Sequence, residues 1–237
     1  MTYCISDIHG CYNEFMLLLS EINFSPDDTL YVLGDAVDRG KDSLRCLQFI
    51  MDTPNIHMLM GNHEQMMIDA LLNYDGKDYL ELWFYNGGES TCLQFLSLSE
   101  DEKVKAIEFL AALPYLVEIK IGNQNFVLVH AGINVGRVPK SMASTANILP
   151  KQSLEDLVWI REKFLNRKAL PKSITIFGHT PTFNIDREYT GKVWKDAKHK
   201  DKTGIDGGCV YGGHLLVLRL DDMVEYAVPK LQPQKMD

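Results

Sequence analysis

The sequence lacks the marks of secreted and membrane-spanning proteins. Its five cysteines are scattered, odd in number and form no C-x-x-C pair. This pattern argues against a disulfide framework or a zinc finger and favours reduced thiols in the cytoplasm. No apolar stretch is long enough to span a membrane, and no signal peptide precedes the first strand-like run. We therefore expect a cytoplasmic protein without a membrane partner.

Positive charge is also scarce. The 237 residues carry 24 basic and 32 acidic side chains, a formal net charge of −8, and no block rich in Lys and Arg. Nucleic acid is therefore not an expected partner. The same imbalance repels phosphorylated ligands at long range, so a phosphate site must create its own positive field. Hydrophobic residues make up 46% of the chain, enough for the core of one large α/β domain or two small ones.

The first third of the chain alternates strand-like and helix-like segments. Apolar strands are expected at 2–6, 30–34 and 56–60. An amphipathic helix follows each strand, near 11–22, 42–52 and 63–73. This rhythm predicts parallel strands joined by right-handed crossovers. In such sheets, ligands collect at the carboxyl ends of the strands.

The remainder contains a mainly helical segment, about 74–113, followed by further strands. Ser99 and Glu102 form a capping-box pattern that opens a helix ending before Pro114. The later elements are expected to be a hairpin at 116–121 and 126–130, a polar loop or flap at 134–151, a helix from 153 through 164, a strand at 174–177 and short antiparallel strands over 203–229. We interpret residues 1–237 as a single domain with 74–113 as a helical insertion.

Polar side chains gather where the apolar strands end. The strings concerned are Asp7-Ile8-His9-Gly10, Gly34-Asp35-Ala36-Val37-Asp38-Arg39-Gly40, Gly61-Asn62-His63-Glu64, His130-Ala131-Gly132 and Gly178-His179-Thr180. Buried strands do not need carboxylates and imidazoles at their ends. A sheet edge that gathers Asp, His and Asn is typical of a site for hard or borderline cations.

In this order, the strings resemble the metallophosphoesterase fold, and more narrowly the phosphoprotein phosphatase family in its compact bacterial and phage form. The match spans residues 7–180, and Trp159-Ile160-Arg161 extends it. The resemblance implies a calcineurin-like α/β architecture. Its four layers, α/β/β/α, are two mixed β-sheets flanked by helices.

The resemblance also implies two divalent metal ions. Asp7 and His9 would hold the first ion, and Asp35 would bridge both. The second ion would be completed by Asn62, His130 and His179. The mixed oxygen and nitrogen set suits Mn²⁺, with Fe or Zn²⁺ as alternatives, better than Ca²⁺. Two such ions exceed the charge of two carboxylates and supply the positive field that the acidic chain lacks.

The remaining motif residues are implied to perform catalysis. His63 would be the general acid that protonates the departing alkoxide, and Asp38 would orient its imidazole. Arg39 and Arg161 would clamp the phosphate, with Asn62 and His63 also facing it. The implied reaction is P–O cleavage by in-line attack of a hydroxide held by the two metal ions.

Several residues have a plainer interpretation. Arg161 could be an ordinary residue of an amphipathic helix surface. Asp206 has two open interpretations, support of the metal site or a turn residue. Cys11 is expected to be a small packing residue. Tyr211 and Tyr85 are expected to pack in the core rather than line a groove.

The leading hypothesis is a metal-dependent protein phosphatase that acts on phosphoserine and phosphothreonine, with phosphotyrosine as a further substrate. The alternative is a symmetrical hydrolase of dinucleoside polyphosphates such as diadenosine tetraphosphate. The intact string Val37-Asp38-Arg39-Gly40 favours the phosphatase. A third hypothesis, an inactive phosphopeptide-binding module, conflicts with the complete ligand set and His63. Partners are thus phosphorylated proteins, peptides or small phosphoesters, and nothing indicates a regulatory subunit.

Overall fold

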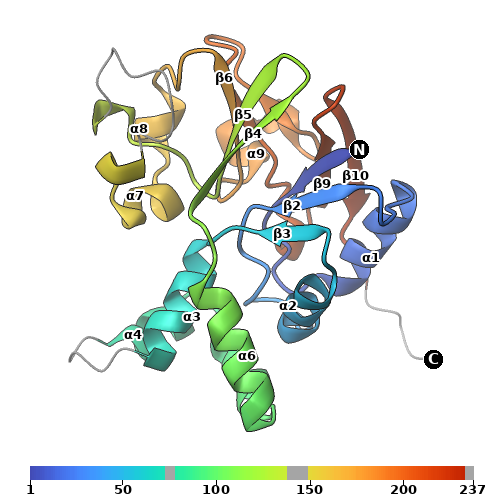
Figure 1. The fold of residues 1–237 in the computed structure, drawn as a ribbon, viewed down its shortest axis with the longest axis vertical. Coiled ribbons are helices and arrows are strands. Elements are labelled where there is room, and N and C mark those ends of the chain that lie inside the picture. Colours follow the sequence, from blue (N-terminus) through green and yellow to red (C-terminus); the bar gives the residue numbers. More distant parts are fainter. Residues whose placement is uncertain (73–77, 138–148, 233–237) are drawn as a thin grey trace.

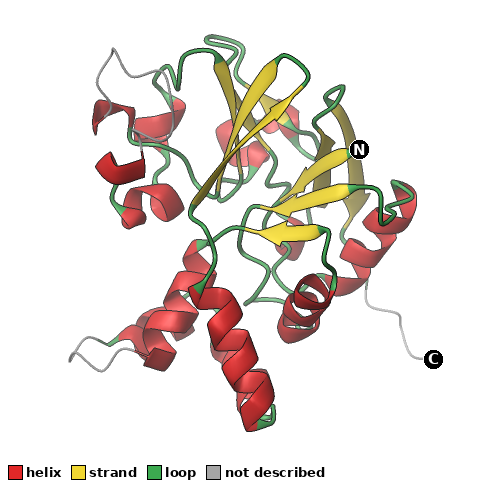
Figure 2. Cartoon of the chain, in the orientation of Figure 1, coloured by secondary structure: helices red, strands yellow, loops and turns green. Residues whose placement is uncertain are grey.

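Two β-sheets lie at the centre of the computed structural model, and helices flank them (Figures 1 and 2). The structure describes residues 1–72, 78–137 and 149–232. Within these residues, no helix combines the length and the apolar character needed to cross a membrane.

The first sheet has the strand order β10-β9-β1-β2-β3. Its strands are β1 (Thr2–Ile5), β2 (Thr29–Val32), β3 (Ile56–Met58), β9 (His214–Arg219) and β10 (Val224–Pro229). β1, β2 and β3 are parallel, as the alternating pattern predicted, whereas β9 and β10 form an antiparallel hairpin beside β1. The sheet is therefore mixed.

The second sheet has the order β4-β5-β6-β8-β7. Its strands are β4 (Leu116–Ile121), β5 (Gln124–Val129), β6 (Ser173–Phe177), β7 (Trp194–Lys195) and β8 (Lys202–Gly204). The predicted hairpin is β4 and β5. β8 differs from the prediction for this region, because it pairs parallel to β6 instead of joining the C-terminal antiparallel strands.

Alternating side chains bury both faces of each sheet. On β1, Tyr3 and Ile5 pack against helices α1 (Tyr12–Glu21) and α2 (Ser43–Asp52), whereas Cys4 faces the other sheet. On β5, Phe126 and Leu128 meet the first sheet, while Val127 and Val129 face helices α7 (Leu154–Trp159) and α8 (Glu162–Leu165). A period of two with both faces apolar requires cover on each side. The result is the predicted four-layer α/β/β/α sandwich.

Four helices extend from the end of β3, and three of them form the predicted helical segment. They are α3 (Asn62–Leu72), α4 (Tyr79–Tyr85), α5 (Glu89–Leu96) and α6 (Glu100–Ala111). The capping box of Ser99 and Glu102 is confirmed at the start of α6. Residues 73–77 lie outside the described part, and the assignment of one domain with a helical insertion stays a prediction.

The helix expected from Ser153 through Phe164 is wrong in one respect, because it is two short helices, α7 and α8. Ile160 adopts an extended conformation and Arg161 also leaves helical geometry, with φ −130° and ψ −99°. The break turns the Arg161 side chain toward the end of β6. Residues 138–148 of the expected flap lie outside the described residues. After β6, the described residues contain one further α-helix, the short α9 (Thr182–Ile185), which precedes β7.

Candidate active site

The predicted site residues meet where β1, β2, β3, β5 and β6 end. A pocket of about 590 Å³ opens there. Its wall includes seven of the residues singled out from the sequence: Asp7, His9, Asp35, Arg39, Asn62, Arg161 and His179. His63, His130 and Asp38 are fully buried beside them. Segments more than 170 residues apart in the chain are thus brought together, as the backbone N–H of His179 donates to Asp7 Oδ2.

The backbone at the site is unusual. Six site residues adopt a left-handed conformation with φ between 45° and 72°: Asp7, His9, Asp35, Asp38, Arg39 and His179. This region is sparsely populated by residues with a side chain, and such strain concentrates at functional sites. The loops after β2 and β3 also pass very close to each other, because a Cβ on Gly61 would lie 2.3 Å from Oδ1 of Asp35. The loops are therefore held in shape by the surrounding fold.

Two histidines direct one ring nitrogen at the same carboxylate. Nδ1 of His9 donates to the carbonyl of Val37 at 2.8 Å, and Nδ1 of His130 donates to that of Leu33 at 2.7 Å. The Nε2 atoms lie 3.5 Å and 3.4 Å from Oδ2 of Asp35. A histidine that donates one N–H to a backbone carbonyl and offers the other nitrogen to a common centre has the arrangement of a metal ligand.

Further acceptor atoms converge on this centre. Oδ1 of Asn62 lies 2.9 Å from Nε2 of His130. Nε2 of His179 is buried and has no partner among the described residues. Asp35, His130 and His179 each offer a ligand atom within 4.8 Å of the others. Lone pairs that converge without a proton between them need a cation, so the residues present fit the divalent ions that the motifs imply.

Burial controls the charge of these groups. It lowers the pKa of His9, His130 and His179, which keeps their rings neutral and able to act as ligands. Burial, together with the neighbouring carboxylate of Asp7, raises the pKa of Asp35 well above its ordinary value. A bound cation would reverse that shift. The site as a whole therefore favours the binding of positive charge.

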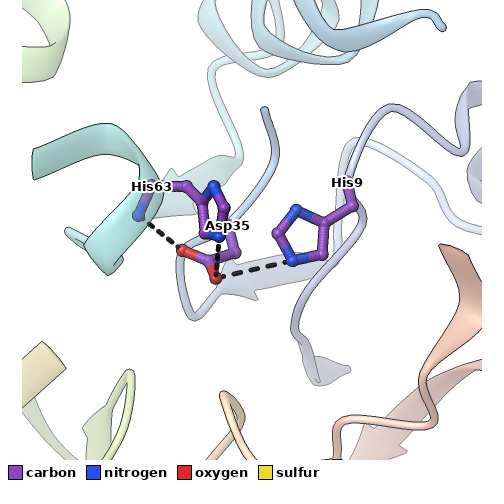
Figure 3. A group of neighbouring side chains, drawn as sticks. All are labelled: His9, Asp35 and His63. Atoms are coloured by element: carbon purple, nitrogen blue, oxygen red, sulfur yellow. Dashed lines mark hydrogen bonds and ion pairs between the residues drawn. The ribbon is translucent and has the colours of Figure 1, made fainter. Parts of the chain in front are cut away.

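His9 and Asp35, from two loops, and His63, from the first turn of α3, point toward one another (Figure 3). The backbone N–H of His63 donates to Oδ1 of Asp35 at 3.0 Å. Nδ1 of His63 lies 2.6 Å from Oδ2 of Asp38. Its Nε2 lies 4.0 Å from Oδ2 of Asp35 and has no hydrogen-bond partner among the described residues. Burial raises the pKa of Asp38 to about 7 and lowers that of His63. The structure thus places the predicted Asp–His pair directly behind Asp35.

Glu64 organises the loop after β2, a role that the sequence did not reveal. Its buried carboxylate accepts the backbone N–H groups of Asp35 at 2.8 Å, Ala36 at 2.9 Å and Val37 at 3.3 Å. It also accepts the N–H of Gly61 at 3.2 Å. One side chain therefore ties two of the motif loops together. The one sequence feature that pointed to Glu64 was its position as the last residue of the string Gly61-Asn62-His63-Glu64.

Arg39 and Arg161 both line the pocket, and each contacts a different histidine. Nη1 of Arg39 lies 2.5 Å from Nε2 of His9, the ring nitrogen on the side of Asp35. Nη1 of Arg161 donates to the backbone carbonyl of His179 at 3.0 Å and to Oγ1 of Thr180 at 3.1 Å. Arg161 is therefore part of the pocket and not simply a residue of a helix surface.

Both tyrosine predictions were wrong. Tyr211 lines the pocket and is 63% exposed, and Tyr85 is 89% exposed. Tyr211 lies in a short 3₁₀ turn whose flanking glycines, Gly208 and Gly212, both have positive φ, which turns the segment outward. Its ring lies under the guanidinium of Arg39, with 5.4 Å between Cζ and the ring centroid.

Asp206 and Cys11 are both buried next to the site. Oδ1 of Asp206 accepts the N–H of Gly208 at 2.8 Å, a turn contact, yet the residue also lines the pocket. Burial and the nearby Asp7 raise its pKa well above the ordinary value. Cys11 packs in the core, as expected, with its Sγ 3.4 Å from the ammonium of Lys230.

The chain is similar in sequence to several known proteins. The family model for calcineurin-like phosphoesterases matches residues 2–218. The chain is 30% identical to Serine/threonine-protein phosphatase 1 of Salmonella typhimurium over 92% of this chain and 91% of that protein. It is 35% identical to the symmetrical Bis(5'-nucleosyl)-tetraphosphatase of Haemophilus ducreyi, over 56% of this chain and 45% of that protein.

The chain spans about half the length of that tetraphosphatase and of other curated relatives that it matches. Among solved structures, one provisionally named a diadenosine tetraphosphatase superimposes with a TM-score of 0.68 at 20% identity. That match covers 98% of this chain and 94% of the other, and it supports the fold.

Proposed function

The chain belongs to the calcineurin-like phosphoesterase family, a family of hydrolases, and we propose that it hydrolyses phosphoserine and phosphothreonine in proteins or peptides. The observation that carries the proposal is the buried pair of His63 and Asp38, whose Nδ1 and Oδ2 atoms lie 2.6 Å apart. The alkoxide of serine or threonine is a poor leaving group unless a proton reaches it as the P–O bond breaks. An imidazole oriented by a carboxylate supplies that proton. Phosphotyrosine is the proposed further substrate.

Dinucleoside polyphosphates make a weaker demand on the site. Their leaving group is a nucleoside diphosphate, a stabilised anion that departs without full protonation. A dedicated acid therefore contributes less to their cleavage than to that of an alkyl phosphate. The similarity to Serine/threonine-protein phosphatase 1 over most of both chains also supports the phosphatase assignment.

Six residues are proposed to hold two divalent ions, Mn²⁺ first, with Fe or Zn²⁺ as alternatives: Asp7, His9, Asp35, Asn62, His130 and His179. When bound, such ions neutralise phosphate charge and make water acidic enough to act as a nucleophile near neutral pH.

The side chains divide the remaining work. Arg39 and Arg161 bind phosphate oxygens, because a guanidinium presents a planar fork of donors. Asn62 and His63 face the same phosphate. Asp38 accepts a hydrogen bond from the Nδ1–H group of His63 and stabilises the imidazolium, so that Nε2 carries the proton for the leaving group. Glu64 keeps the loop of Asp35 in place through its backbone N–H contacts.

The second candidate is the symmetrical hydrolysis of a dinucleoside tetraphosphate. One structural feature favours it. Tyr211 and Phe183 bring aromatic rings to the pocket wall, where a nucleobase could stack. The inactive binding module is disfavoured because the ligand set and the Asp–His pair are complete.

The test is release of inorganic phosphate from a phosphoserine peptide by the Mn²⁺-loaded protein. Turnover that disappears on chelation and returns with Mn²⁺ supports the proposal. A protein that is loaded with two ions yet leaves the peptide intact would contradict it.

For the chain as a whole, we propose one domain with residues 74–113 as an insertion. We also propose that the protein works in a reducing compartment such as the cytoplasm, in line with its five unpaired cysteines.

A further inference from the structure

The Asp–His pair is held by a helical segment that lies outside the sequence motifs. Nε1 of Trp83, in α4, donates to Oδ2 of Asp38 at 2.9 Å. Oγ1 of Thr91, in α5, accepts the backbone N–H of Asp38 at 3.0 Å. These contacts join positions 45 and 53 residues apart in the chain. They anchor both the carboxylate and the backbone of Asp38 to the same pair of helices.

The turn between α4 and α5 is shaped for this contact. The carbonyl of Gly87 accepts the backbone N–H of Arg39 at 3.0 Å. A Cβ on Gly88 would lie 2.2 Å from Nε1 of Trp83. Only glycine therefore lets the chain pass behind the indole while the N–H points at Asp38. Residues of this helical segment thus accept the backbone N–H groups of both Asp38 and Arg39, the two neighbouring residues with positive φ.

Oδ2 of Asp38 accepts from two ring donors, Nδ1 of His63 at 2.6 Å and Nε1 of Trp83 at 2.9 Å. All three side chains are inaccessible to solvent. Water therefore cannot replace the indole N–H if it is removed. Indole nitrogen can only donate, so its direction fixes the orientation of the carboxylate, and through it the plane of the imidazole. The other carboxylate oxygen, Oδ1, has no partner among the described residues.

We propose that Trp83 is a positioning residue for leaving-group protonation: its indole N–H holds the Asp38 carboxylate in the orientation that aims His63 at the leaving group. The helical segment 79–96 thereby completes the acid, and it does so without touching the phosphate. This inference rests on the proposed function of His63, and it predicts that the indole matters most for substrates whose leaving group needs a proton.

The experiment compares phenyl phosphate, a poor leaving group, with 4-nitrophenyl phosphate, a good one, using the Mn²⁺-loaded protein. Trp83→Phe removes the N–H. Replacement of Trp83 by 3-benzothienylalanine removes the N–H while keeping the shape, which answers the concern that the smaller ring unfolds the site. Each variant is expected to lower kcat for phenyl phosphate about tenfold, since the lost hydrogen bond is made to a charged acceptor. kcat for 4-nitrophenyl phosphate falls much less, and KM stays unchanged for both.

Two further variants test the second anchor. Thr91→Val is expected to act in the same direction, and Thr91→Ser, which keeps the hydroxyl, is expected to restore the wild-type ratio. Phe95→Leu is the matched control, because Phe95 is a buried aromatic of α5 that packs in the core. It is expected to leave the ratio of the two kcat values unchanged.

A readout independent of turnover is the low-field proton resonance of the His63 Nδ1–H, recorded with Zn²⁺ in place of Mn²⁺ because paramagnetic Mn²⁺ would broaden it. It should shift or disappear in the two Trp83 variants and persist in Phe95→Leu. Equal loss on both substrates, or no loss on either, together with an unchanged resonance overturns the proposal. Failure of the wild-type protein on phosphopeptides contradicts the proposed function instead, and leaves the comparison of aryl phosphates to decide the role of Trp83.

Discussion

The Nε2 atom of His130 lies 2.9 Å from the Oδ1 atom of Asn62, although neither atom has a proton to donate. The Nδ1 proton of His130 is engaged by the carbonyl of Leu33, and burial lowers the pKa of the ring, which leaves Nε2 with a lone pair. Two acceptors at this distance are stable together only around a cation. The pair therefore supports metal binding through its geometry together with the neutral state of the buried ring.

Metal removal should abolish both the activity and part of the stability. We expect about two Mn²⁺ per chain, and we expect the melting temperature to rise on reloading, because an ion that binds only the folded state stabilises it. His130→Ala should bind fewer ions. Equilibrium dialysis with elemental analysis measures the stoichiometry, and differential scanning calorimetry measures the shift. Full activity after exhaustive chelation would contradict the two-metal account.

The two arginines should act on substrate binding. Arg39→Ala and Arg161→Ala are each expected to raise KM for a phosphomonoester roughly tenfold, since a hydrogen bond to a charged oxygen is lost. Arg161 is held by the carbonyl of His179, so Arg161→Lys should recover little, because a single ammonium cannot make both contacts. Steady-state kinetics decides this. If only Arg39 changes KM, the assignment of Arg161 is wrong.

Glu64→Gln should destabilise the fold. The amide keeps one acceptor oxygen, but its NH₂ group meets backbone N–H donors that the carboxylate now accepts. We expect a loss of about 2 kcal/mol in the free energy of unfolding, the cost of unsatisfied buried donors. Urea denaturation of the metal-free protein measures it. Glu21→Gln, at an exposed position of α1, serves as the control and should change little.

Asp206→Asn should change how stability depends on pH. The folded pKa of Asp206 is raised above its unfolded value, mainly by burial. As pH rises above the unfolded value, the unfolded chain releases this proton while the folded protein retains it, so stability falls through that window. The asparagine variant lacks this loss and keeps the acceptor for Gly208. Relative to wild type, the metal-free variant should therefore gain stability as pH rises above about 4, the ordinary pKa of an aspartate. Parallel pH profiles for the two proteins would contradict the expectation.

That the six candidate metal ligands lie together could be predicted from the sequence, because each of them follows the end of a strand. The carboxyl ends of parallel strands meet at one edge, so His9 and His179 are brought together by topology that the sequence pattern reveals. The four-layer architecture follows in the same way from strands that are apolar on both faces. The sequence pattern was sufficient for residues whose position depends on the strand that they follow.

Other features depend on tertiary packing and left no local signal. In the sequence, Trp83 has no feature that distinguishes it from other aromatic residues of a helix. Its contact with Asp38 forms only because α4 packs beside the turn after β2. The break at Ile160 and Arg161 interrupts a helical pattern because Arg161 is drawn to the carbonyl of His179. The prediction that Tyr211 packs in the core was wrong because flanking glycines with positive φ turn its segment outward, to the pocket wall.

The most direct test of the account is the effect of His63→Asn on two substrates, a phosphoserine peptide and diadenosine tetraphosphate, measured side by side with Mn²⁺. For the wild-type protein, kcat/KM should be higher for the peptide. The variant should lose at least about 100-fold in kcat on the peptide, the contribution of a general acid, and much less on the tetraphosphate. A wild-type preference for the tetraphosphate, or an unchanged rate on the peptide in the variant, would contradict it.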